Sequence, residues 1–113
     1  MTTWRIRLSY QAQRDIQEVL ARTYDQFGDK KYDEYRELIR LALMDIASNP
    51  YHPRTRQRPE IHASARTCHL TRSGKRARHF ILFRVMDNHT VEIGRLLYDA
   101  MEISCHLPNG YQP

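Results

Sequence analysis

Apolar and polar residues alternate at the start of the chain, and the spacing then becomes helical. Residues 3–9 place every second side chain on the same side, as in a half-exposed strand. From Ser9, whose hydroxyl suits a helix N-cap, apolar residues recur every three or four positions as far as Phe27. Gly28 is a typical helix stop. The pattern therefore predicts a strand followed by one helix.

A second helical pattern begins near Asp29 and ends before Asn49 and Pro50. Its inner stripe consists of Tyr32, Tyr35, Ile39, Ala42, Leu43 and Ile46. The one- or two-residue connection to the first helix predicts an antiparallel helical hairpin. Leu38 and Leu41 lie beyond one edge of the stripe, so the apolar face is wider than a single contact requires. They either bind a partner or make edge contacts within the protein's own core.

The second half of the chain reads mainly as strands. Residues 51–59 carry arginines among prolines, which excludes regular helix and predicts a basic connecting loop. Residues 66–72 are one candidate strand. Residues 78–86 are a second, with so little alternation that it is expected to be central and buried on both faces. A turn is predicted at 87–89.

The last predicted strand points Val91 and Ile93 to one side and Glu92 and Leu96 to the other. Residues 99–104 suit a short helix, and 109–113 a loose tail. The order of elements predicts an α+β fold in a single domain, residues 1–108. Its antiparallel two-helix hairpin packs on an antiparallel sheet that includes the N-terminal strand.

Charge is concentrated in the middle of the 113-residue chain. The formal net charge is +5, and residues 1–50 hold eight basic and eight acidic side chains. Residues 51–95 hold ten basic and three acidic ones. Such a segment favours a polyanionic partner, either a nucleic acid or an acidic protein, although a solvated basic face is the alternative.

Composition excludes several other classes of protein. No apolar run is long enough for a membrane span or a signal peptide, so we expect a cytoplasmic protein without membrane contact. Cys68 and Cys105 are expected to be reduced thiols. The six histidines show no close pair at metal-ligand spacing, so we expect no metal and no cofactor.

Three segments occur in an order that resembles the ParE branch of the RelE/ParE toxins. The segment beginning "LSYQAQRD" continues through "FG" to "NP", as in the ParE helical hairpin. The segments "RTCHLTRSGKRARHFILFRV" and "VEIGRLLYDAMEISCHLP" resemble the family's strands and its ending. The similarity extends from Ile6 to Leu107. Tyr98 and Glu102 depart from it, standing where the ending usually has His and Asp.

The resemblance implies a RelE/ParE-like fold and the toxin of a type II toxin–antitoxin system. ParE relatives inhibit DNA gyrase by binding and block replication, and a cognate antitoxin neutralises them. RelE relatives instead cut messenger RNA on the ribosome. The main hypothesis is therefore a non-catalytic gyrase inhibitor. The alternatives are a messenger RNA endoribonuclease and a basic nucleic-acid-binding module, with direct nucleic-acid binding otherwise a secondary activity.

Candidate site residues follow from the basic segment and the family ending. The predicted target-binding set is Arg66, Arg72, Arg84, Arg95, Tyr98 and Met101. The predicted antitoxin-binding set is Leu38, Leu41, Arg72 and Arg95. A ribonuclease would use Arg72, Arg95 and Tyr98, but a permanently charged Arg is a poor base and Tyr98 would need a much lowered pKa. We therefore expect no catalytic residue.

Arg95 is the most informative of these residues because it continues a strand whose neighbours Val91 and Ile93 are expected in the core. A cation in that position requires an anion. The anion is either internal, from Asp99 or Glu102, or belongs to the target or the antitoxin.

Overall fold

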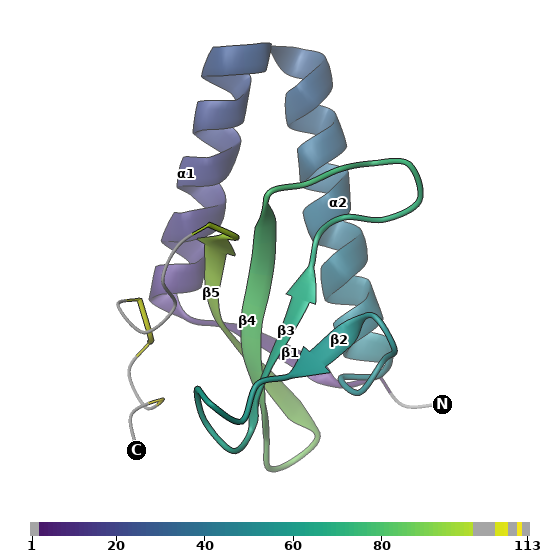
Figure 1. Cartoon of the computed structure of the whole chain (residues 1–113), viewed down its shortest axis with the longest axis vertical. Helices are drawn as coiled ribbons and strands as arrows, with labels where there is room; N and C mark the ends of the chain where they lie inside the picture. Colours follow the sequence, from purple (N-terminus) through teal and green to yellow (C-terminus); the bar gives the residue numbers. More distant parts are fainter. Residues whose placement is uncertain (1–2, 101–105, 109–110, 112–113) are drawn as a thin grey trace.

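The computed structural model describes residues 3–100, 106–108 and 111 (Figure 1). In chain order the elements are β1 (Arg5–Leu8), α1 (Tyr10–Phe27), α2 (Asp29–Ser48), β2 (Thr55–Gln57), β3 (Ala65–His69), β4 (His79–Met86) and β5 (Thr90–Tyr98). The predicted α+β class and the order of strand, two helices and further strands are confirmed.

The helical hairpin begins and turns where the sequence predicts. Ser9 caps α1, since its hydroxyl oxygen accepts the N–H of Ala12 at 3.0 Å. At Gly28 the backbone φ is +84°, a conformation that favours glycine, and its N–H donates to the carbonyl of Tyr24. The chain can therefore end α1 and start α2 within one residue. The two helices lie side by side and extend well beyond the end of the sheet (Figure 1).

The five strands form one mixed sheet in the order β1-β5-β4-β3-β2. Neighbours from β2 to β5 are antiparallel, but β1 pairs with β5 in parallel, from Arg5 opposite Thr90 to Leu8 opposite Ile93. The predicted antiparallel sheet is thus wrong at this edge. Local alternation shows that a strand exists and which side is buried, but not its partner or its direction.

The loop predicted over residues 51–59 contains a short edge strand. Thr55–Gln57 pairs with β3, with Arg56 opposite Thr67. The strand fits because Pro53 and Pro59 flank it, which leaves its backbone N–H groups free for the sheet. At three residues it is too short to show an alternating pattern.

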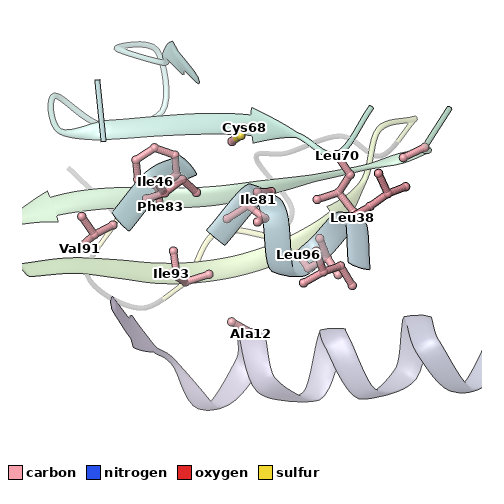
Figure 2. Close-up of a cluster of buried hydrophobic side chains, with 13 residues drawn as sticks. Ala12, Leu38, Ile46, Cys68, Leu70, Ile81, Phe83, Val91, Ile93 and Leu96 are labelled. Atoms are coloured by element: carbon pink, nitrogen blue, oxygen red, sulfur yellow. The ribbon is translucent and has the colours of Figure 1, made fainter. Parts of the chain in front are cut away.

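The main core lies between the helices and the sheet (Figure 2). Ala12 of α1 and Ile46 of α2 are fully buried against Phe83 and Val91 of the central strands. Leu38 is only 5% exposed and belongs to this core. It therefore makes an intramolecular contact and is not an exposed surface for a partner.

A β-bulge interrupts the pairing of β4 with β5. The register shifts by one residue and leaves Gly94 without a partner between Ile93 and Arg95. Side chains beyond the bulge alternate in the opposite phase. Leu96 consequently lies in the helix-side core with Val91 and Ile93, which corrects the prediction that it faces away from them.

The face of the sheet turned away from the helices, called here the outer face, carries a second buried cluster. Its buried members are Ala65, Phe80, Leu82, Leu97 and Tyr111. Tyr111 is fully buried, so it does not belong to the loose tail expected over 109–113. Asp99 and Ala100 form a turn, and the remainder of the helix predicted over 99–104 lies outside the described residues.

Candidate target-binding surface

Arg95 is engaged inside the molecule. Its Nε donates to Asp15 Oδ2 at 2.7 Å and its Nη2 to Oδ1 at 3.0 Å, while Nη1 donates to the carbonyl of His106. Asp15 also accepts the backbone N–H of Leu96 at 3.0 Å. The bonded carboxylate raises the pKa of Arg95 further. The internal ion pair considered from the sequence thus exists, but its partner comes from α1 and is not Asp99.

Arg72 is held by the other helix. Its Nη1 donates to Asp45 Oδ2 of α2 at 2.9 Å, and the Nε of Arg54 lies 3.7 Å from the same oxygen. The Asp45 side chain is 20% exposed and the Arg72 side chain 23%. Arg72 and Arg95 are therefore neutralised by carboxylates of two different helices.

Arg66 and Arg84 also make internal contacts. Arg66 donates from Nε to the carbonyl of Pro50 and from Nη2 to the hydroxyl of Thr55, which ties the loop after α2 to β3. Arg84 donates from Nε to Glu92 Oε1 at 3.0 Å. Each guanidinium has a structural role before any partner arrives.

The predicted arginines do not form one basic surface. Arg66 pairs with Phe83, whose side chain lies in the helix-side core, so Arg66 points to the helix side of the sheet. Arg95 pairs with Leu82 of the outer-face cluster, and Arg84 follows the same alternation. The expectation that the basic segment 51–95 forms one polyanion-binding surface is therefore not met by these side chains. Strand alternation and the bulge at Gly94 divide them between two faces.

Tyr98, the aromatic residue among the predicted site residues, is 40% exposed at the end of β5. The Nη2 of Arg78 donates to its hydroxyl at 3.3 Å, and the Arg78 guanidinium lies over its ring. His79 meets the ring edge-on, and Arg78 also approaches Asp99 at 3.6 Å. These four residues, with Tyr35 and His69, are called here the Tyr98 cluster. It combines an exposed aromatic ring with an exposed cation.

Tyr35 determines the protonation of His79. The Tyr35 hydroxyl accepts the backbone N–H of Arg78 at 3.1 Å, so we assign its own proton to the bond with His79 Nδ1 at 2.5 Å. His79 is then the neutral Nε2–H tautomer. Burial lowers the pKa of His79 and raises that of Tyr35, which favours the neutral form of both.

His69 is also fully bonded. Its Nδ1 accepts the backbone N–H of Thr71 at 3.1 Å, which leaves Nε2–H to donate to Asp99 Oδ2 at 3.1 Å. A general base needs an available lone pair within reach of the proton it removes. Neither histidine of the Tyr98 cluster offers one in this arrangement.

The sequence predicted Tyr98 as a site residue but did not predict the contacts around it. Tyr35 was predicted only as part of the inner stripe of the second helix, and Arg78, His69 and His79 were not among the predicted site residues. The available signal was His79 itself, a titratable residue at the start of a buried strand. Its pairing with Tyr98 depends on the register of β4 and β5, which local patterns do not encode.

The two remaining predicted contact residues are Leu41 and Met101. Leu41 is half-buried on α2, close in sequence to Met44, which is 54% exposed. Met101 lies outside the described residues. The outward side of α2 therefore offers an apolar contact at Leu41 and Met44 without Leu38.

Within residues 3–100, 106–108 and 111, no group of three or more His, Cys, Asp or Glu side chains is arranged to hold a metal ion. Burial raises the pKa of the Cys68 thiol to about 11, so this thiol is protonated at neutral pH. Neither helix combines the length and apolar character needed to cross a membrane.

The helical hairpin over a five-stranded mixed sheet, preceded by an N-terminal strand, is the fold of RelE/ParE-like toxins. The crystal structure of the toxin–antitoxin complex RelBE2 from Mycobacterium tuberculosis contains a chain that superposes with a TM-score of 0.58 at 18% identity, covering 86% of this chain and 99% of that chain. The family model of the ParE toxin of the type II toxin–antitoxin system parDE matches residues 6–103. The chain therefore belongs to the ParE toxin family, as its sequence predicted. Comparison with curated proteins gives no significant match.

Proposed function

We propose that this toxin inhibits DNA gyrase by binding it. The toxin itself makes and breaks no covalent bonds. The proposal rests first on membership of the ParE family. The geometry supports it because the groups considered for catalysis are already engaged. Arg72 and Arg95 are paired with Asp45 and Asp15, and the histidines beside Tyr98 have no free acceptor nitrogen.

We place the principal target contact at Tyr98 and Arg78. Tyrosine and arginine are enriched among the residues that dominate binding energy, and here one guanidinium already orders the exposed ring. Such an ordered pair loses little side-chain freedom on binding. Arg66, Arg72, Arg84 and Arg95 then serve mainly to hold the fold that presents this pair.

Gyrase supercoiling tests the proposal directly. Purified toxin should inhibit supercoiling, and Tyr98→Ala should raise the half-inhibitory concentration by about 30-fold, the effect of losing a contact of about 2 kcal/mol. The matched control is Tyr24→Ala, because Tyr24 is similarly exposed at 51% but lies on α1. Uninhibited supercoiling at a large excess of toxin would refute the gyrase proposal. Equal effects of the two variants would refute only the placement at Tyr98.

One observation favours messenger RNA cleavage as the second candidate. The Arg78 guanidinium holds the Tyr98 hydroxyl in place by donating to it, and the same cation can stabilise a phosphorane. Ribosome-dependent cleavage would then disappear in Tyr98→Phe, which keeps the ring. Gyrase inhibition through ring contacts would survive the same substitution, so this variant separates the two functions.

We further propose a cognate antitoxin that covers the apolar strip of Leu41 and Met44. An acidic segment that orders on binding would suit the basic protein. Met44→Glu should weaken the complex about 10-fold in a titration, whereas Ala21→Glu on α1 should not. Charge reversal at Arg72 and Arg95 is unsuitable as a test because it would leave Asp45 and Asp15 without their cations. An unchanged dissociation constant for Met44→Glu would remove this strip from the interface.

A further inference from the structure

A polar cleft lies at the opposite end of β4 from the Tyr98 cluster. Its volume is about 330 Å³, at the lower end for small-molecule sites. Its lining residues come from the loop after α2, from β2 and β3 and the loop between them, and from the end of β4 and the turn after it. The course of these segments can be followed in Figure 1. Of its lining residues only Arg66 was among the predicted target contacts, and none belongs to the proposed gyrase contact at Tyr98 and Arg78.

An exposed and pre-ordered aromatic ring forms one wall of this cleft. Tyr51 is 56% exposed, and the Arg66 guanidinium lies over its ring at 5.2 Å from the centroid. Trp4 meets the ring edge-on at 6.4 Å and is itself stacked on His89 at 4.0 Å. Two contacts thus hold the Tyr51 ring in place, although more than half of the side chain faces solvent.

The guanidinium behind the ring is equally ordered. Arg66 donates to the carbonyl of Pro50 and to the hydroxyl of Thr55, so its position does not depend on a ligand. An aromatic ring backed by a guanidinium is a stacking platform for a nucleobase, because every base presents a π-face.

The remaining walls provide hydrogen bonds and an apolar surface. Gln57 offers both a donor and an acceptor, and Ser64 offers a hydroxyl, the groups that recognise base edges. Val85 supplies apolar contact, and the Asp87 carboxylate can accept an exocyclic amino group. The same carboxylate disfavours an acidic peptide inside the cleft. Arg56 next to Gln57 is exposed and has no ion pair within the described part of the chain, so it can attract a phosphate outside the cleft.

From this arrangement we propose that the cleft at Tyr51 and Arg66 binds a nucleobase, either of a free nucleotide or of a single-stranded nucleic acid. The base stacks on Tyr51 while Gln57 and Ser64 contact its edge. Both sources share the base and its phosphate, and they differ in whether the chain of nucleotides continues past the cleft. The inference does not depend on gyrase as the target.

Trp4 provides the readout because it is the single tryptophan of the chain and touches Tyr51. Adenosine 5′-monophosphate and an oligoadenylate of five nucleotides are titrated against the purified full-length toxin, with ribose 5-phosphate as the baseless control. Saturable quenching by either base-containing probe, but not by ribose 5-phosphate, is expected. Equal affinities indicate a nucleotide site, whereas much tighter oligoadenylate binding indicates a single-strand site.

Variants locate the binding, measured by calorimetry so that a change at Tyr51 does not alter the readout. Tyr51→Ala should weaken binding about 5- to 160-fold, the effect of losing one stacked base at about 1–3 kcal/mol. Tyr51→Phe should retain it, and Tyr24→Ala is the control for an exposed tyrosine elsewhere. Unchanged binding in Tyr51→Ala, or no saturation with either probe, would overturn the proposal. Gyrase inhibition should be unaffected by Tyr51→Ala, so the two proposals fail separately.

Discussion

Removing the Arg95 guanidinium should destabilise the fold more than any surface charge change. In Arg95→Ala, the Asp15 carboxylate would lose two of its three donors and keep only the N–H of Leu96. The Asp15 side chain is 12% exposed and the Arg95 side chain 19%, so water can replace little of what is lost. Breaking a buried pair from one side costs about 3–5 kcal/mol, and the residual exposure argues for about 3 kcal/mol. That corresponds to a melting temperature lower by roughly 15 °C.

Urea unfolding followed by circular dichroism measures this loss, and two variants test its cause. Arg14→Ala removes an exposed pair with Glu18, whose side chains are 59% and 60% exposed, and should leave the midpoint unchanged. Arg95→Met combined with Asp15→Leu should recover most of the stability, because neither charge is then left unpaired. A double variant as unstable as Arg95→Ala, or an Arg95→Ala midpoint equal to wild type, would refute the reasoning.

Three further substitutions follow from single contacts. Gly94→Ala would place a Cβ 2.8 Å from Pro108 Cγ, so it should lower stability by about 1–3 kcal/mol and loosen the C-terminal segment, as faster carboxypeptidase digestion would show. Tyr35→Phe removes the donor to His79 and the acceptor for a backbone N–H, and should cost about 1–2 kcal/mol in urea unfolding. Because burial lowers the pKa of His79 in the folded state, the unfolded chain binds its proton more readily. Unfolding midpoints should therefore fall as the pH drops below about 6.5, and His79→Gln should flatten this slope.

Local patterns predicted the elements well because each depends on neighbouring residues. The cap at Ser9, the stop at Gly28 and the helical stripes are encoded within a few positions, and all appear in the structure. The strand β2 was missed because three residues between prolines show no periodicity. The parallel pairing of β1 with β5 joins residues about 85 positions apart.

The candidate site was harder to predict because it depends on register and on ion pairs across the fold. One unpaired residue, Gly94, reverses the side-chain phase of the strand that follows it. Arg95 therefore leaves the side that Val91 and Ile93 define, and its partner Asp15 lies 80 residues earlier. No spacing within the basic segment could have identified that carboxylate.

The charge count illustrates the same difference between composition and structure. The excess of basic residues over 51–95 suggested one polyanion-binding surface. In the structure, however, Asp15 of α1 and Asp45 of α2 form ion pairs with Arg95 and Arg72. Paired charges contribute little to the long-range field, so the remaining attraction comes from scattered exposed cations. Under the two proposals, recognition relies on short-range contacts of exposed rings that a guanidinium orders, Tyr98 with Arg78 and Tyr51 with Arg66. The two pairs lie at opposite ends of the sheet, so the proposed gyrase contact and the proposed nucleobase site do not overlap.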